Sequence, residues 1–312
     1  MVSPVLFTLG TRGSPLALAQ AREARRRLVF AHGWSEEQVA IEVIRTTGDM
    51  IQDRPLAEAG GKGLFTKEID SALLEGRIDF AIHSAKDLPT ALPDGVTLAG
   101  FLPREDARDA LICNVADSFA TLPHGARLGA ASLRRQAQAR RLRPDLRLQL
   151  LRGNVETRLR KVESGEIEAT LLALAGLKRL GLADRARALL DIDDFLPAVG
   201  QGAIAIAARR GDARVLAALT PIDDEATHIA LIAERAFLAV LDGSCRTPIA
   251  GHARLAGGAL TLRGQVLRED GSESFEIARS GAPREAERLG AEAGQTLLAR
   301  LPHGVLAIKG QR

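Results

Sequence analysis

Turns that lead from a strand-like run directly into a helix recur along this 312-residue chain, and they limit its possible folds more than any other feature. Apolar runs at Val5–Thr11, Arg127–Ala130 and Leu146–Leu151 each end in such a turn. Strands that alternate with helices favour parallel pairing, because a parallel connection needs a crossover, which is usually a helix. The sequence therefore predicts an α/β protein with parallel sheets.

Each of these helix starts carries a helix-capping residue, serine or asparagine, together with arginine. The three motifs are Arg12-Gly13-Ser14-Pro15, Ala131-Ser132-Leu133-Arg134-Arg135 and Arg152-Gly153-Asn154-Val155-Glu156-Thr157-Arg158. The first turn of a helix attracts anions through its free N–H groups and its dipole, and it repels cations. Arg134 and Arg135 therefore suit their positions if a bound anion offsets the repulsion. The pattern predicts a site for a carboxylate or a phosphate.

Positive charge is concentrated in one segment. Residues 127 to 161 contain ten Arg and one Lys against Asp145 and Glu156, a balance of +9, so the rest of the chain carries −6 of the net +3. One basic segment suits a polyanionic ligand better than a general nucleic-acid coat. Few aromatic residues (3%) are present for stacking on bases, which also disfavours nucleic acid. Arg140, Arg141 and Arg143 also fit a solvated helix face.

A second group of reactive residues follows an apolar run at Phe80–His83. Ser84, Lys86 and Asp87 come next, and Pro89 ends the stretch. Polar groups at the carboxyl end of a strand lie where open α/β sheets bind their ligands. A surface turn with a solvated Lys-Asp pair is the alternative.

The glycine-rich stretch 48–62 precedes the helix that leads to this strand, and it predicts either a mobile lid over the site or a loop without a role.

Two cysteines, Cys113 and Cys245, are too few and too far apart for a metal framework. We expect Cys113 to be a small buried residue. The sequence has neither a run of about 18 apolar residues nor a signal peptide pattern, so we expect a soluble cytoplasmic protein without a membrane or metal partner.

Seven idiosyncratic motifs occur in order between Leu9 and Ala253. They are TRGSPLALAQ, GGKGLFTKEID, HSAKDLPT, ASLRRQAQ, LLRGNVETRL, LPAVGQGA and GSCRTPIAGHA. In these motifs the chain closely resembles the porphobilinogen deaminases, also called hydroxymethylbilane synthases, of porphyrin and haem biosynthesis. The resemblance implies a transferase that joins four porphobilinogen molecules into the linear tetrapyrrole hydroxymethylbilane and releases ammonia. It also implies a dipyrromethane cofactor, a primer on which the chain grows.

The same resemblance implies a fold of two periplasmic-binding-protein-like α/β domains that flank a cleft, plus a smaller C-terminal α+β domain. Domain 1 would comprise residues 1–102 and 200–220, including the mobile loop 48–62. Domain 2 would comprise residues 103–199, which carry most of the arginines. Domain 3 would comprise residues 221–312 and carry the cofactor cysteine. A monomer with porphobilinogen as its small-molecule partner is expected.

Site residues are implied by the positions that match the family motifs. Asp87 and Lys86 would be catalytic, with Asp87 as the anion that stabilises cationic pyrroles. The dipyrromethane would be bound through a thioether to Cys245 and held by Ser84, Lys86, Ser132, Arg134, Arg135 and Asn154. The substrate would be bound by Arg12, Ser14, Lys62, Arg152, Arg158, Arg179 and Gln201. Glu58 replaces the lysine of many members, so a loop contact to substrate would depend mainly on Lys62.

One alternative from another class of protein stays open. A two-domain solute-binding or regulatory module for a carboxylated ligand would explain the helix starts but not the setting of Cys245. The intact mass of the protein distinguishes the two, because only the deaminase carries a covalent addition.

Overall fold

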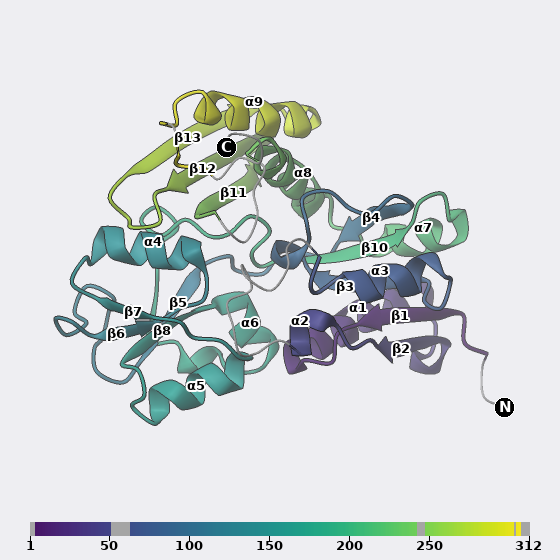
Figure 1. The fold of residues 1–312 in the computed structure, drawn as a ribbon. Helices are drawn as coiled ribbons and strands as arrows, with labels where there is room; N and C mark the ends of the chain where they lie inside the picture. Colours follow the sequence, from purple (N-terminus) through teal and green to yellow (C-terminus); the bar gives the residue numbers. More distant parts are fainter. Residues whose placement is uncertain (1–3, 51–62, 242–246, 303, 307–312) are drawn as a thin grey trace. The chain divides into compact units, whose positions relative to one another are not determined.

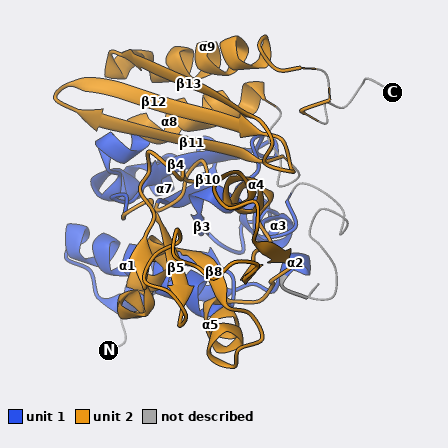
Figure 2. Ribbon diagram, turned by 90° about the vertical axis from the view of Figure 1, so that its left-hand side faces the viewer, with its two compact units in different colours: residues 1–105, 203–228 blue, residues 106–202, 229–312 orange. Residues whose placement is uncertain are grey.

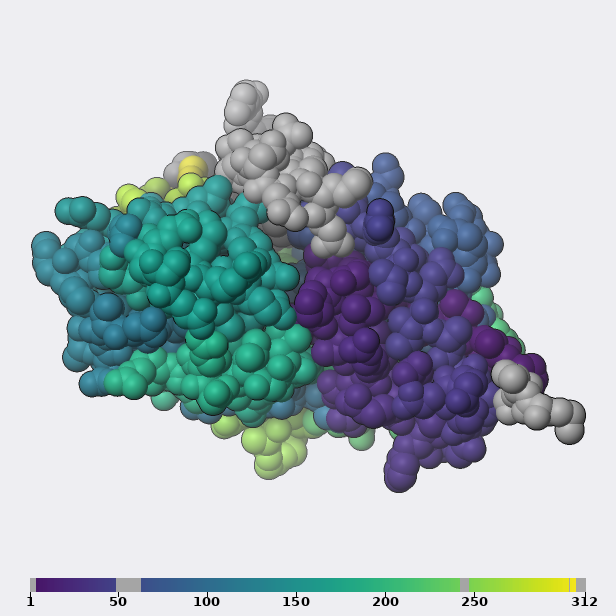
Figure 3. All heavy atoms as spheres, turned by 90° about the horizontal axis from the view of Figure 1, so that it is seen from below, coloured from purple at the N-terminus to yellow at the C-terminus, as the bar shows by residue number. Residues whose placement is uncertain are grey.

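The computed structural model describes the whole chain except residues 1–3, 51–62, 242–246, 303 and 307–312, which are grey in Figures 1, 2 and 3. The chain forms two compact units, coloured separately in Figure 2. Unit 1 contains residues 1–105 and 203–228, and unit 2 contains residues 106–202 and 229–312. In the space-filling view of Figure 3, purple marks the N-terminal residues of unit 1.

Unit 1 is built around a five-stranded sheet with the order β2-β1-β3-β10-β4 (Figure 1). β1 is parallel to β2 and β3, whereas β10 is antiparallel to both β3 and β4. The apolar run after Gln201 forms β10. The strands are β1 (Phe7–Thr11), β2 (Val39–Val43), β3 (Phe80–Ser84), β4 (Val96–Phe101) and β10 (Ile204–Arg209).

Helices cover both faces of this sheet. Because successive side chains of a strand point to opposite faces, neighbouring residues of β10 pack against different helices. Ile204 and Ile206 of β10 pack with Leu28 of α1, whereas Ala207 packs with Ile69 and other residues of α3. Ser14 caps α1 as predicted, and Pro15 occupies its first turn. The helix expected after the stretch 48–62 begins at Lys67. The helices are α1 (Pro15–His32), α2 (Thr47–Met50), α3 (Lys67–Leu74) and α7 (Ala213–Leu219).

The first part of unit 2 repeats this topology. Its sheet has the order β7-β6-β8-β5-β9, with β6 parallel to β7 and β8 and with β5 antiparallel to β8 and β9. Ser132 caps α4 and Asn154 caps α5, as the motifs predict. The elements are β5 (Asp109–Cys113), β6 (Arg127–Gly129), α4 (Leu133–Leu142), β7 (Arg147–Gln149), α5 (Val155–Glu163), β8 (Ala169–Ala173), α6 (Leu174–Arg179) and β9 (Ala188–Leu189).

The C-terminal part of unit 2 is a smaller α+β arrangement. A three-stranded antiparallel sheet has the order β11-β12-β13, and Gly257 and Gly258 form the tight turn between its first two strands with positive φ angles of 58° and 78°. Gly264 of β12 lies against the ring of Phe237, where a Cβ would come within 2.3 Å of it. The elements are α8 (Glu225–Val240), β11 (Ile249–Ala256), β12 (Ala259–Leu267), β13 (Ser274–Gly281) and α9 (Ala286–Leu298).

These sheets confirm the predicted fold class, two α/β sheets and a smaller C-terminal α+β part. Within the described ranges, no helix has the length and apolar character needed to cross a bilayer.

Candidate functional site

A pocket in unit 1 lies at the carboxyl ends of β1 and β3. The two strands are parallel, with Leu9 opposite Phe80, so the residues that follow them reach the same edge of the sheet. Four of the predicted site residues line this pocket. The lining residues are Arg12, Ser14, Leu16, Ala17, Gln20, Phe65, Thr66, Ile82, His83, Ser84 and Asp87.

Asp87 stands at the end of a single 3-10 turn, Ala85–Asp87, that directly follows β3. The turn is fixed at its start, because the Ala85 N–H donates to the Ala203 carbonyl at 3.0 Å. Lys86 and Asp87 are both exposed, and Asp87 lines the pocket whereas Lys86 is not among the lining residues. The turn therefore presents one carboxylate to the pocket from a rigid strand.

Gln20 is a pocket residue that the sequence analysis missed. Its amide is hydrogen-bonded to the Ser84 hydroxyl, with 2.9 Å between Gln20 Nε2 and Ser84 Oγ, and its side chain is buried. The signal was a polar residue in the inward stripe of α1, which otherwise contains Ala21, Ala24 and Leu28. Gln20 thus fixes the position of the Ser84 hydroxyl beside the pocket.

His83 is the second residue that was missed. It is buried, and its Nε2 has no hydrogen-bond partner among the described residues. Burial, and secondarily the positive charge of Arg12, lowers the pKa of His83 to about 4. The imidazole is therefore neutral at pH 7 and offers a hydrogen-bonding group without charge. Arg12 itself lies over the Phe65 ring, 4.1 Å from its centroid.

Arg134 and Arg135 of unit 2 are buried and share one carboxylate, that of Asp109. Arg135 donates to Asp109 Oδ1 from Nε at 2.9 Å and from Nη2 at 2.6 Å. Arg134 Nη2 lies 2.8 Å from Asp109 Oδ2. Burial lowers the pKa of Arg134, and the charge of Asp109 opposes this shift. An anion does offset the two arginines, but in this structure it is a side chain of the chain itself.

Gln201 joins the same cluster. Its Nε2 donates to the Ala107 carbonyl at 2.7 Å and to Asp109 Oδ1 at 3.2 Å. Arg179 comes from another part of the chain, and its Nη2 donates to the Gly202 carbonyl at 2.9 Å. The structure thus gathers Arg134, Arg135 and Gln201 around one buried carboxylate, and it anchors Arg179 to the segment beside Gln201.

Three further predicted residues lie at the start of α5. Asn154 is exposed and accepts a hydrogen bond from the Thr157 N–H at 2.9 Å, while Arg158 Nε donates to the Gly153 carbonyl at 2.9 Å. Arg152 is half-buried. Gly153 has a φ of 108°, a backbone conformation that favours glycine and lets the chain turn sharply into the helix.

The remaining predictions concern the loop 48–62, the two cysteines and metal binding. Lys62, Glu58 and Cys245 lie outside the described residues, as does the predicted loop 48–62 beyond its first three residues. Cys113 is buried as predicted, and its thiol donates to the Ala116 carbonyl at 3.2 Å. No group of three potential metal ligands occurs in the described part of the chain.

Comparison with known proteins gives one consistent result. A family model described as "Porphobilinogen deaminase, dipyromethane cofactor binding domain" matches residues 7–217, and one described as "Porphobilinogen deaminase, C-terminal domain" matches residues 228–299. Curated proteins named "Porphobilinogen deaminase" from Nitrobacter winogradskyi and Nitrobacter hamburgensis are each 60% identical over 296 residues, which is 95% of this chain and 94% of theirs.

Two solved structures illustrate a distant resemblance. A putative methionine-binding lipoprotein from Bacillus subtilis aligns with a TM-score of 0.42 and 14% identity, over 69% of this chain and 89% of its own. A periplasmic substrate-binding protein of an ABC transporter from Coxiella burnetii aligns with a TM-score of 0.44 and 13% identity, over 69% and 91%.

Proposed function

This chain belongs to the porphobilinogen deaminase family, and from that premise we propose which of its residues carry out the reaction. The enzyme is a transferase of porphyrin and haem biosynthesis that polymerises porphobilinogen into hydroxymethylbilane with release of ammonia. It uses a dipyrromethane cofactor. The high identity over nearly the whole length disfavours a solute-binding or regulatory module.

Each condensation needs a carboxylate. The C–N bond of the aminomethyl group of porphobilinogen breaks and ammonia leaves, so the substrate carbon becomes part of a cation until a new C–C bond forms. The pyrrole that attacks this carbon then loses the proton from its own α-carbon. A fixed anion lowers the energy of the cation, and the same group can accept the proton.

Asp87 is the group we assign to this task, and its position at the pocket of unit 1 is the single observation that carries the assignment. The pocket combines this carboxylate with the Arg12 guanidinium and the Ser14 and Ser84 hydroxyls. A substrate with acetate and propionate groups and a developing positive charge needs this combination of donors and one anion. Lys86 stands next to Asp87 on the exposed turn and is proposed to assist it.

The donor groups present fit a carboxylated dipyrromethane. Two buried polar atoms, His83 Nε2 and Arg134 Nε, have no hydrogen-bond partner among the described residues, as expected where a further polar group completes a site. When bound, the dipyrromethane supplies the pyrrole α-carbon to which the first substrate unit is joined. We propose that Cys245 attaches it through a thioether and that these side chains bind its carboxylates: Ser84, Lys86, Ser132, Arg134, Arg135 and Asn154.

Substrate carboxylates are proposed to bind to the remaining cations and amides near the helix starts. Arg12 and Ser14 line the pocket, and Arg152 and Arg158 flank the start of α5, where the helix dipole adds to their attraction for an anion. Arg179 and Gln201 are proposed as further substrate contacts, with Lys62 as the contact from the loop 48–62.

We propose the domain boundaries, the oligomeric state and the localisation that the sequence led us to expect. Domain 1 contains residues 1–102 and 200–220, domain 2 residues 103–199, and domain 3 residues 221–312. We propose a cytoplasmic monomer that binds no nucleic acid.

Intact mass spectrometry of the purified full chain tests this function. The protein is expected to exceed its polypeptide mass by two pyrrole units, and Cys245→Ala is expected to lack this addition. Cys113→Ala is the matched control and should retain it, because the Cys113 thiol is buried and bonded to a carbonyl. An addition that persists in Cys245→Ala would contradict the assignment.

A further inference from the structure

We propose that Gln138 and Gln265 are positioning residues that hold the Arg134 guanidinium through a buried hydrogen-bonded link to the C-terminal sheet of unit 2. The inference rests on the proposed role of Arg134 in binding the dipyrromethane. It concerns two residues to which neither the motifs nor the reaction chemistry assigns a role, since Gln138 is only the last residue of the motif ASLRRQAQ and Gln265 lies outside all seven motifs. All members of the link belong to unit 2.

The guanidinium of Arg134 is held by three protein groups. Its Nη1 donates to Gln138 Oε1 and to the Leu196 carbonyl, each at 2.9 Å, and its Nη2 pairs with Asp109. The Phe195 ring lies below it, 5.6 Å from the guanidinium carbon to the ring centroid. An arginine bound in this way keeps one orientation, which a carboxylate ligand requires of a planar guanidinium.

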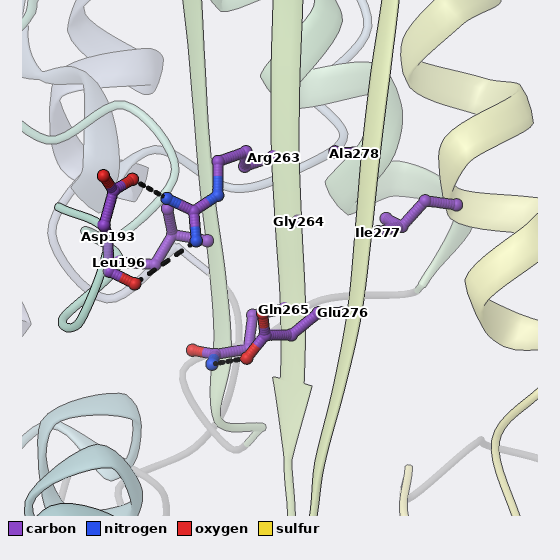
Figure 4. A pocket seen from close by; sticks show the side chains of 8 residues that line it. All are labelled: Asp193, Leu196, Arg263, Gly264, Gln265, Glu276, Ile277 and Ala278. Carbon is purple, nitrogen blue, oxygen red and sulfur yellow. Dashed lines mark hydrogen bonds and ion pairs between the residues drawn. The ribbon is translucent and has the colours of Figure 1, made fainter.

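Gln138 extends the contacts of Arg134 to the sheet. Its Nε2 donates to Gln265 Oε1 of β12 at 2.8 Å and to the Leu196 carbonyl at 3.0 Å. Gln265 in turn donates from Nε2 to Ser274 Oγ at 3.0 Å and to Glu276 Oε1 at 2.9 Å, both on β13. Figure 4 shows the bond between Gln265 and Glu276 at the edge of a pocket on this sheet.

Two buried glutamines at this contact require an explanation. Gln138 is 2% exposed and Gln265 is 7% exposed, and Gln138 stands between Ala137 and Ala139 on the buried side of α4. A buried amide costs free energy unless its groups are bonded, and an apolar residue would pack there without that requirement. Fully bonded polar chains fix one geometry where an apolar contact permits several. The link therefore fixes how α4, which carries Arg134, sits on β12.

Gln138→Met tests the link, because methionine keeps the length of the side chain and removes both its donor and its acceptor. Intact mass of the full chain, taken soon after expression, gives the ratio of primer-loaded to primer-free protein. Loss of a hydrogen bond to a charged group is expected to lower this ratio about tenfold or more. Gln265→Met, one bond further from Arg134, is expected to lower it by a smaller factor.

Gln136→Met is the matched control on the same helix, since Gln136 Nε2 donates to the Ala130 carbonyl at 2.8 Å and not to Arg134. Thermal unfolding of each variant separates positioning from stability. The proposal holds if Gln138→Met loses primer while Gln136→Met of similar or lower unfolding temperature does not. It fails if the two variants load alike.

A further variant separates this proposal from the proposed function. Arg134→Leu that loads fully would show that Arg134 does not bind the primer. Impaired Arg134→Leu together with normal Gln138→Met would leave the function intact and overturn only the positioning link. If Gln138→Met does not fold, Gln265→Met decides by the same comparison with Gln136→Met.

Discussion

The two five-stranded sheets share one strand order and the same strand directions, yet Asp87 of unit 1 and Asp109 of unit 2 lie at different strands. β8 corresponds to β3, and β5 corresponds to β10, so Ala173 and Asp109 of unit 2 match Ser84 and Ile204 of unit 1 in the register. Unit 1 has its carboxylate after the parallel strand, on an exposed turn, whereas unit 2 has its carboxylate at the start of the antiparallel strand, fully buried.

This difference separates two uses of a carboxylate. Asp109 is 0% exposed and pairs with two arginines, so the three side chains form a fixed buried cluster with one carboxylate for two guanidinium groups. Asp87 faces a pocket and remains accessible to a substrate. With the roles proposed above, one sheet would supply a reactive group and the other would supply fixed binding groups. Three predictions test whether this distinction holds.

Asp109→Asn is expected to have the largest effect. It keeps the shape of the side chain but leaves Arg134 and Arg135 buried without a countercharge, which costs about 3–5 kcal/mol of unfolding free energy when one partner of a buried pair is lost. Urea unfolding at pH 7 measures this loss. Asp117→Asn is the control, because Asp117 is 82% exposed and its pair with Arg187 lies at the surface. Equal losses of unfolding free energy in Asp109→Asn and Asp117→Asn would contradict a special role of the buried Asp109 carboxylate.

Asp87→Asn should leave stability almost unchanged and impair the reaction instead. The neutral amide cannot stabilise a cationic pyrrole, so turnover of porphobilinogen is expected to fall by about 10²–10³. Asp94→Asn, also exposed in unit 1, should keep wild-type turnover. A decrease of less than about tenfold in Asp87→Asn would assign the central role to another group.

The comparison also explains what the sequence could predict. Caps at Ser14, Ser132 and Asn154 are local features and were confirmed, because a cap needs only residues three positions apart. The parallel strands followed from the same junctions. The positions of Arg134 and Arg135 predicted a bound anionic ligand; the structure places the Asp109 carboxylate beside them, and the ligand stays a prediction.

Long-range contacts were beyond that reasoning. Asp109 pairs with Arg135 across 26 positions in the chain, and Gln20 reaches Ser84 across 64. No periodic pattern identifies such pairs, so the anion beside the arginines was expected to be a ligand. His83 looked like one more member of a strand, because burial and the lack of a partner are properties of the packed structure.

His83 provides the third prediction, which has the smallest expected effect. Unit 1 also buries an ionisable group beside its site, but this group has no countercharge. The pKa of His83 is about 4 in the folded protein, against the ordinary value of 6.5 that applies to the unfolded chain. The unfolded chain therefore binds a proton first as pH falls below 6.5, and stability is lost down to about pH 4. Between pH 7 and pH 5 this group should remove roughly 2 kcal/mol of unfolding free energy.

Urea unfolding at both pH values measures this difference against His83→Asn, which should lose that much less than the wild type because it lacks the group. His228 is the matched control, since its bond to Asp223 raises its pKa above the ordinary value. A raised folded pKa gives stability that is present below pH 6.5 and is lost as pH rises, so His228→Asn should instead lose more than the wild type on acidification. If His83→Asn showed the same loss as the wild type, unit 1 would not bury a neutral imidazole beside its site. The contrast with the compensated charge of Asp109 would then rest on Asp87 alone.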